Sequence, residues 1–174
     1  MLPDPEPFLE HLFAALHNDG VDVADLELDH ICYRVDRRER YTELRDRLAQ
    51  RDHLLIESVV GGRPIATFRL NEPVRSNGRV IEVLELPSPK ISASTTESRY
   101  QEGFEHVEFV TNEELADLVQ RHPELDWDLS ALSKETNPDV RLRYDGFSVK
   151  FHRRSLVDII AEEQCDHRAA NGRS

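Results

Sequence analysis

Two stretches of this sequence follow the same plan, and this internal repeat constrains the fold more than any other feature does. Each stretch opens with alternating polar and apolar residues that place an acid, a histidine and a β-branched residue in a row, at Asp29-His30-Ile31 and again at Glu105-His106-Val107. Such alternation is typical of a strand with one buried face. In both stretches a helix-like segment and three further extended segments follow. The sequence therefore predicts a β-α-β-β-β unit that is used twice.

Turn and cap residues mark the elements of the first unit. Asp36 is expected to cap its helix, and Gly61-Gly62 predicts a hairpin turn between two strands. Residues 71–78 contain proline, asparagine and glycine, which predicts a looser link to the closing strand. The extended segments expected here are 54–60, 64–70 and 79–86.

The second unit repeats these signals. Thr111, with Glu114 three residues later, is typical of a capping box that opens a helix running to about Arg121. Asp145-Gly146 predicts a hairpin between the last two strands. The extended segments expected here are 104–110, 127–132, 140–144 and 147–152.

These elements predict a single α+β domain over residues 1–174. Because both unit helices are expected on the outer face, the two sets of strands can curl into one mixed sheet around a shared cleft. A helix with apolar residues at helical spacing precedes the first unit, and another follows the second. The expected boundaries are an N-terminal helix over 5–19, module one over 28–90, a linker over 91–101, module two over 102–153, and a C-terminal helix and tail over 154–174.

The net charge of the chain limits the classes of partner that it is expected to bind. With 22 Lys and Arg against 34 Asp and Glu, the net charge is −12, which argues against nucleic acid or an anionic membrane as a partner. The two cysteines do not make a disulfide framework, and the sequence shows neither a signal-peptide pattern nor an apolar run of membrane-spanning length. We therefore expect a soluble, cytoplasmic protein that binds a small molecule, and we leave open a homodimer.

His30 and His106 are candidate metal ligands because the repeat places them at matching positions of two first strands. Neighbouring residues on a strand point to opposite faces, so both imidazoles are expected on the concave face, away from the apolar residues beside them. On that face Cys32 is also expected to line the cleft, without an adjacent base that would make it a nucleophile. In the closing strand of the first unit, Glu82 and Glu85 are three residues apart and point to opposite faces, so only one of them can be a third ligand. Glu85, near the end of that strand, is favoured.

These residues and their surroundings resemble a known family. The sequence resembles the YecM family, bacterial proteins described as metal-binding, from the N-terminal helix to about Ile160. The segments that carry the resemblance are DHICYRV at 29–35, GRPI at 62–65, VLELPSPK at 83–90, YQEGFEHVE at 100–108 and KFH at 150–152. The resemblance implies membership of the vicinal oxygen chelate superfamily, which includes glyoxalase I, methylmalonyl-CoA epimerase, extradiol dioxygenases and bleomycin-resistance proteins.

The superfamily resemblance implies a set of metal ligands. In its metal-dependent members the first and last strands of each module supply them, which implies His30, Glu85 and His106 as ligands of a divalent ion such as Zn, Ni, Mn or Fe. The fourth position, where the superfamily often has a glutamate, falls on Lys150, whose ammonium has no lone pair for a metal. The implied site is therefore a triad of two histidines and one carboxylate, with open positions for water and substrate.

Other side chains are candidates for catalysis or substrate binding. Glu108 and Lys150 are the acid and base candidates. Glu108 can instead orient His106. Lys150 can hold a substrate anion, act as a base if burial lowers its pKa, or be an ordinary strand lysine. His152 shares a side with Lys150 and is a candidate replacement ligand or proton relay. The arginines that suit an anionic substrate, if they face the cleft, are Arg34, Arg63, Arg69, Arg141 and Arg143.

The leading interpretation is a metal-dependent enzyme with isomerase, lyase or oxygenase chemistry on a small, oxygen-chelating and anionic substrate. The alternative is a non-catalytic protein of the bleomycin-resistance type, which would sequester a small molecule in a cleft lined by Tyr33, Trp127, Tyr144 and Phe147. A metal-carrying protein whose acidic surface meets a basic partner is a third interpretation. The sequence holds no nucleotide-binding, zincin or serine-hydrolase motif.

Overall fold

The computed structural model describes residues 2–90 and 101–171, with side chains as far as Cys165. These residues form four helices and eight strands. The helices are α1 (Glu6–Asn18), α2 (Arg38–Arg51), α3 (Leu115–Arg121) and α4 (Leu156–Asn171), and the strands are β1 (Glu27–Arg34), β2 (His53–Val60), β3 (Arg63–Ser76), β4 (Arg79–Pro87), β5 (Gly103–Val110), β6 (Trp127–Asp128), β7 (Asp139–Arg143) and β8 (Ser148–His152).

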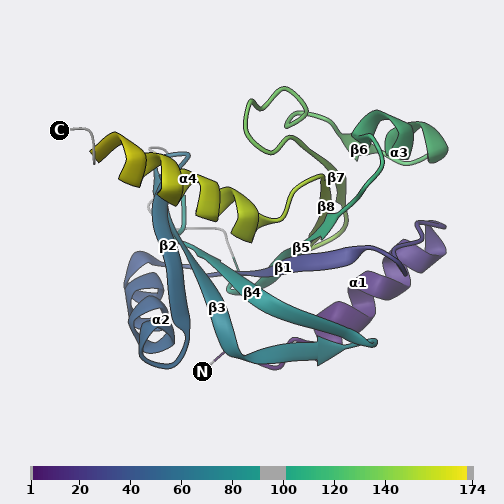
Figure 1. The fold of residues 1–174 in the computed structure, drawn as a ribbon. Helices are drawn as coiled ribbons and strands as arrows, with labels where there is room; N and C mark the ends of the chain where they lie inside the picture. The colour runs from purple at the N-terminus through teal and green to yellow at the C-terminus, as the bar shows by residue number, and fades with distance from the viewer. Residues whose placement is uncertain (1, 91–100, 172–174) are drawn as a thin grey trace.

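The strands join in one open, mixed sheet with the order β2-β3-β4-β1-β5-β8-β7-β6 (Figure 1). In each half the first strand is parallel to the closing strand, β1 to β4 and β5 to β8. The two halves meet where β1 and β5 pair antiparallel, so the second half repeats the first around an approximate twofold axis. The predicted fold class, two β-α-β-β-β modules with a helix at each end, is confirmed.

One face of the sheet is apolar and packs against α1, α2 and α3. In α1, Leu9, Leu12 and Leu16 are buried at spacings of three and four, which places them on one side of the helix. Phe13 of α1 packs edge-on against Phe109 of β5, with ring centroids 6.4 Å apart. The other two helices bury Tyr41, Leu44, Leu48, Leu115 and Leu118 in the same core. This packing leaves the opposite face of the sheet for polar side chains.

The last helix, α4, is placed differently, because it runs from the end of β8 towards β2 (Figure 1). Its first residue, Leu156, donates its backbone N–H to the carboxylate of Asp29 on β1 at 3.0 Å. Farther along, the side-chain amide of Gln164 donates to the carbonyl of Leu55 on β2 at 2.9 Å. The helix therefore ties the end of the second half to the first. No helix among the described residues has the length and the apolar content needed to cross a bilayer.

Both predicted glycine hairpins are confirmed. Gly61 and Gly62 join β2 to β3 with φ angles of 58° and 79°, a region that glycine adopts without steric cost. Gly146, with a φ of 85°, lies in the turn between β7 and β8, where Arg143 pairs with Ser148.

The predicted looser link over 71–78 is wrong for most of its length. Strand β3 continues to Ser76, and Val74 pairs with Ile81 of β4 after an irregularity in the register. Because Pro73 falls inside that irregularity, its missing N–H does not interrupt a regular ladder. The turn itself is only Asn77-Gly78, both with positive φ.

The predicted cap of α2 is wrong. The N-cap of α2 is Arg37, and no side chain bonds to the helix start. Asp36 is therefore one position too early to cap it.

The predicted capping box before α3 is also wrong. Thr111 accepts a hydrogen bond from the N–H of Glu113 at 3.3 Å, and α3 begins only at Leu115. A threonine hydroxyl that closes such a local turn competes with the capping geometry.

The extended segment expected over 127–132 is shorter than predicted, because β6 ends at Asp128. Its carboxylate accepts the N–H of Ser130 at 3.0 Å, and this local bond turns the chain out of the sheet. Of the expected linker over 91–101, residues 91–100 lie outside the described residues, as do residues 172–174 of the expected tail.

Candidate metal centre

Three side chains from three neighbouring strands form one row on the polar face of the sheet. Cys32 of β1 pairs with Glu85 of β4 on one side and with His106 of β5 on the other. Glu85 Oε2 lies 3.6 Å from His106 Nε2. Cys32 is fully buried between its two neighbours.

A second row lies beside the first, two residues along β1 and β5. His30 of β1 pairs with Glu108 of β5, which in turn pairs with Lys150 of β8. The backbone register of four strands thus determines which side chains meet.

Glu85 and Lys150 occupy equivalent positions in the two halves of the sheet. In the first half, Cys32 lies two residues after His30, and its neighbour on the closing strand is Glu85. In the second half, Glu108 lies two residues after His106, and its neighbour on the closing strand is Lys150. The register therefore agrees with the sequence comparison that set Lys150 at the position of a glutamate. The backbone follows the twofold symmetry at these two positions, but the charges do not, because Glu85 is an acid and Lys150 is a cation.

Both imidazoles point at the same carboxylate oxygen. His30 Nε2 lies 3.4 Å and His106 Nε2 lies 3.3 Å from Oε1 of Glu108. All three side chains are buried, and His30 Nε2 has no hydrogen-bond partner among the described residues. At 3.4 Å the contact of this nitrogen with Glu108 is an ion pair without a hydrogen bond.

The second nitrogen of His30 is oriented by an acid that the sequence reasoning missed. Its Nδ1 lies 2.8 Å from Oδ2 of Asp29. Adjacent residues of a regular strand would face opposite sides, but the pairing of β1 with β5 shifts register between Leu28 and His30. The irregularity brings Asp29 to the side of His30, and an acid directly before a histidine is the only sign of it in the sequence. A carboxylate on the far nitrogen is the usual support of a metal-binding histidine.

Asp29 also contacts His152, the candidate replacement ligand. His152 Nε2 lies 3.4 Å from Oδ2 of Asp29 and 3.8 Å from Oε2 of Glu108, and its Nδ1 lies 2.7 Å from the side-chain amide nitrogen of Asn137. Burial works against ionisation of Asp29, but hydrogen bonds from His152 and His30 outweigh it and lower its pKa to about 2. Asp29 is therefore a permanent carboxylate that links two histidines to the start of α4.

The candidate acid and base form an ion pair. Lys150 donates a hydrogen bond from Nζ to Glu108, and the same Nζ lies 3.2 Å from His106 Nε2. Burial favours the neutral form of each partner, yet the opposite charges prevail: the pKa of Glu108 is lowered well below its usual value, and that of Lys150 is raised. The condition under which Lys150 would be a base, a lowered pKa, is not met.

The two histidines differ in protonation. Burial lowers the pKa of His30, but the carboxylates of Glu108 and Asp29 outweigh it and raise the pKa to about 10. For His106, burial and the charge of Lys150 lower the pKa, so its imidazole is neutral and Nε2 presents a lone pair. His30 is thus an imidazolium at neutral pH, and His106 is ready to coordinate.

The ligands expected from the sequence are divided between two groups. In the first, ligand atoms of His30, His106 and Glu108 lie within 4.8 Å of one another, and in the second those of Cys32, Glu85 and His106 do. His106 belongs to both, whereas His30 and Glu85 fall in different groups. Glu82, the alternative to Glu85, lines a hollow beside Asp29.

The first group fits a divalent ion. A tetrahedral ion with bonds of about 2.0–2.1 Å holds its ligand atoms about 3.3–3.4 Å apart, and the distances from Glu108 Oε1 to the two Nε2 atoms agree with this separation. Imidazole and carboxylate are ligands that suit Zn, Mn, Fe and Ni.

A polar hollow of about 450 Å³ lies beside this cluster, with Asp29 in its wall. Its charged lining consists of Arg69, Arg153 and Arg154 and the acids Glu27, Asp29, Glu82 and Asp158. Arg153 pairs with Glu114, and Arg154 pairs with Glu162. Of the arginines expected to face the cleft, Arg69 lies here. Three others have structural contacts: Arg34 with Glu105, Arg63 with the carbonyl of Ser88, and Arg143 with Asp128.

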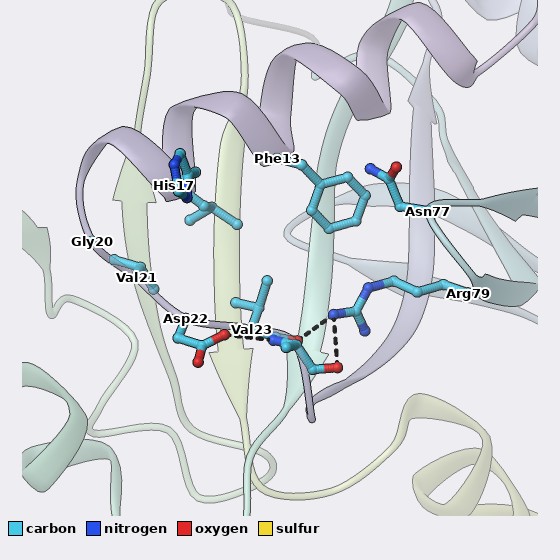
Figure 2. Close-up of a pocket in the computed structure, with 10 residues that line it drawn as sticks. Phe13, His17, Gly20, Val21, Asp22, Val23, Asn77 and Arg79 are labelled. Atoms are coloured by element: carbon cyan, nitrogen blue, oxygen red, sulfur yellow. Dashed lines mark hydrogen bonds between the residues drawn. The ribbon is translucent and has the colours of Figure 1, made fainter.

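A larger hollow, of about 540 Å³, lies beneath α1 and contains none of the predicted site residues (Figure 2). Figure 2 shows the guanidinium of Arg79 turned towards the loop that follows α1, where it donates to the carbonyls of Val23 and Ala24. The same guanidinium lies 5.5 Å from the ring centroids of Phe13 and Phe109. Arg79 therefore fastens the loop to the core.

The four aromatic residues expected to line a sequestering cleft pack in the hydrophobic core instead. Tyr33 stacks edge-on against Phe104, Trp127 packs against Phe151, and Tyr144 stacks on Phe147. The side chains that converge on the polar face are charged or imidazole groups, so the structure offers no aromatic cleft among these residues.

Comparison with known proteins agrees with this architecture. The family model described as YecM protein matches residues 1–163. Protein YecM of Escherichia coli is 31% identical, with 83% of this chain and 82% of that protein covered. A solved structural-genomics structure, Protein EC4020, superposes with a TM-score of 0.72 at 28% identity, covering 90% of this chain and 88% of that one.

A more distant structure shares the fold. Methylmalonyl-CoA epimerase of Streptomyces coelicolor, in complex with 2-nitronate-propionyl-CoA, superposes with a TM-score of 0.52 at 17% identity, covering 75% of this chain and 97% of the epimerase. That enzyme is a member of the vicinal oxygen chelate superfamily. The family predicted from the sequence is confirmed: this chain belongs to the YecM family and has the fold of the vicinal oxygen chelate superfamily.

Proposed function

We propose that this protein binds a divalent metal ion through His30, His106 and Glu108 and is a metal-dependent enzyme for a small, anionic substrate. Glu108 takes the place that the sequence assigned to Glu85. The ion would supply Lewis-acid chemistry to neighbouring oxygens of the substrate, as isomerase, lyase and oxygenase reactions require.

The convergence of the two imidazoles on one carboxylate oxygen carries this proposal. Their distances to Glu108 Oε1, 3.4 Å and 3.3 Å, are those of ligands around one ion. Burial excludes water, which strengthens every charge interaction at the site.

Lys150 and Glu85 are then proposed as the groups that act on the substrate. Lys150 contacts Glu108 and His106, so if these two residues held an ion its ammonium would be available to an anionic oxygen or as a proton donor. Glu85, 3.6 Å from His106, is the nearby carboxylate that can accept a proton.

The neighbouring hollow supports a small anionic substrate. Arg69 lines it beside Arg153 and Arg154, which also pair with Glu114 and Glu162, and guanidinium groups bind carboxylates and phosphates in a bidentate manner. The related epimerase is solved with a CoA ester bound. By this proposal, the substrate would lie along the polar face with its anionic end at the arginines.

Metal analysis of the untagged protein tests the proposal. We expect about one equivalent of a divalent ion in the wild type, and a loss of at least about tenfold in affinity for His30→Ala and for His106→Ala. His53→Ala, at an exposed histidine of β2, is the matched control and should bind like wild type. Undiminished binding in both site variants would show that the site is misassigned.

A further inference from the structure

Cys32 has a position that the proposed site does not use. It lies fully buried in the floor of the polar face, with Glu85 on the neighbouring strand to one side and His106 on the other. The ligand atoms of the three residues lie within 4.8 Å of one another. A thiol, a carboxylate and an imidazole together are a ligand set that zinc and similar ions prefer.

The two groups of ligands differ in chemical softness. His30, His106 and Glu108 offer nitrogen and oxygen, whereas the group around Cys32 adds sulfur. Thiolate ligands favour thiophilic ions, whereas a group of imidazole and carboxylate ligands without sulfur also holds harder ions such as Mn²⁺. His106 Nε2 faces both groups, at 3.3 Å from Glu108 and 3.6 Å from Glu85, and one nitrogen lone pair coordinates one ion. The two positions are therefore mutually exclusive.

We propose that Cys32, Glu85 and His106 form an alternative metal position that takes thiophilic divalent ions such as Zn²⁺ and Co²⁺, while Mn²⁺ takes the position at His30, His106 and Glu108. This inference rests on the proposed function, because it names which ions the same cluster distinguishes. Movement of an ion between the two positions would exchange His30 and Glu108 for Cys32 and Glu85, with His106 retained, and would release the proton of the Cys32 thiol.

The test is Co²⁺ titration of the metal-free, full-length protein under reducing conditions. A cobalt–thiolate bond produces an intense charge-transfer absorption in the near ultraviolet, which nitrogen and oxygen ligands do not. We expect this absorption in the wild type, and we expect it to be lost in Cys32→Ser and Cys32→Ala. It should persist in Cys165→Ser, the matched control at the exposed second cysteine. Circular dichroism of both Cys32 variants establishes that they are folded.

Mn²⁺ binding, followed by electron paramagnetic resonance, separates the two positions. Glu108→Gln should weaken Mn²⁺ binding at least about tenfold and leave the cobalt–thiolate absorption, whereas Cys32→Ser should leave Mn²⁺ binding unchanged. Loss of Mn²⁺ binding in Cys32→Ser would overturn the inference of two positions.

The remaining outcomes distinguish the two proposals. Two outcomes would overturn the role of Cys32 and leave the proposed function in place. One is Co²⁺ binding that depends on His30 and His106 but lacks the thiolate absorption, and the other is a thiolate absorption that survives in Cys32→Ala. Metal binding indifferent to both histidines would overturn the proposed function as well.

Discussion

The ammonium of Lys150 lies 3.2 Å from Nε2 of His106 and donates a hydrogen bond to Glu108 at the same time. A positive charge on the protein thus neutralises Glu108 and lies against the neutral imidazole of His106, two of the groups proposed to hold a metal ion. Since the ion and the ammonium need the same lone pairs, they compete.

Removal of this internal competitor is expected to tighten metal binding. Lys150→Met breaks charge-assisted hydrogen bonds worth about 1.5–3 kcal/mol, so the affinity should rise about tenfold or more. Competition with a calibrated chelator measures this change. Lys134→Met, which removes a surface partner of Asp139, is the control and should have no effect. A weaker affinity in Lys150→Met would mean that the lysine supports the ion rather than competing with it.

Metal binding is expected to release a proton from His30. Its pKa of about 10 means that the imidazole is charged at neutral pH, and coordination requires the neutral form. Below that pKa the affinity should therefore rise about tenfold for each pH unit, and level off near pH 10. Calorimetry in buffers of different ionisation enthalpy counts the released protons. Binding without proton release would place the ion away from His30.

Asp29→Asn is expected to weaken metal binding by about 10- to 100-fold, because His30 loses the carboxylate that orients it. The same change removes a charged acceptor from the N-terminus of α4, so the free energy of unfolding should fall by about 1 kcal/mol. Chelator competition and urea unfolding measure the two effects. Asp25→Asn, at an exposed loop position, is the control; equal metal affinity in the two variants would contradict the role given to Asp29.

The free energy of unfolding at alkaline pH is expected to depend on the ionisation of Tyr33. Burial and the hydrogen bond to Glu102 raise its pKa from 10.0 to about 12. Because the folded state holds this proton more tightly, the stabilisation is complete below pH 10 and is lost as pH rises towards 12, by about 2 kcal/mol in total. Urea unfolding of wild type and Tyr33→Phe between about pH 9 and 11 isolates the effect, since other tyrosines titrate in both proteins. A parallel pH dependence in the two proteins would contradict this assignment.

The sequence was informative about the fold wherever a pattern is local and periodic. Alternation at Asp29-His30-Ile31 and Glu105-His106-Val107 predicted the two first strands, and Gly61-Gly62 and Asp145-Gly146 predicted the hairpins. The caps at Asp36 and Thr111 failed because the exact start of a helix depends on competing hydrogen bonds within one turn.

The candidate site was predictable only as far as the repeat extends. The matching histidines follow from it, whereas the position of Lys150 was implied by the resemblance to the superfamily, and its equivalence with Glu85 is seen only in the strand register. The meeting of His30 with Glu108 depends on the antiparallel register of β1 and β5, and the position of Asp29 depends on a register shift; neither leaves a periodic signal in the sequence.

The equivalence of Glu85 and Lys150 gives the polar face a direction. A molecule with two identical ends would bind equally well in both orientations between the acid Glu85 on β4 and the cation Lys150 on β8. A molecule with a single anionic end, by contrast, would meet opposite charges at these two positions, so they would favour one orientation of such a molecule over the other.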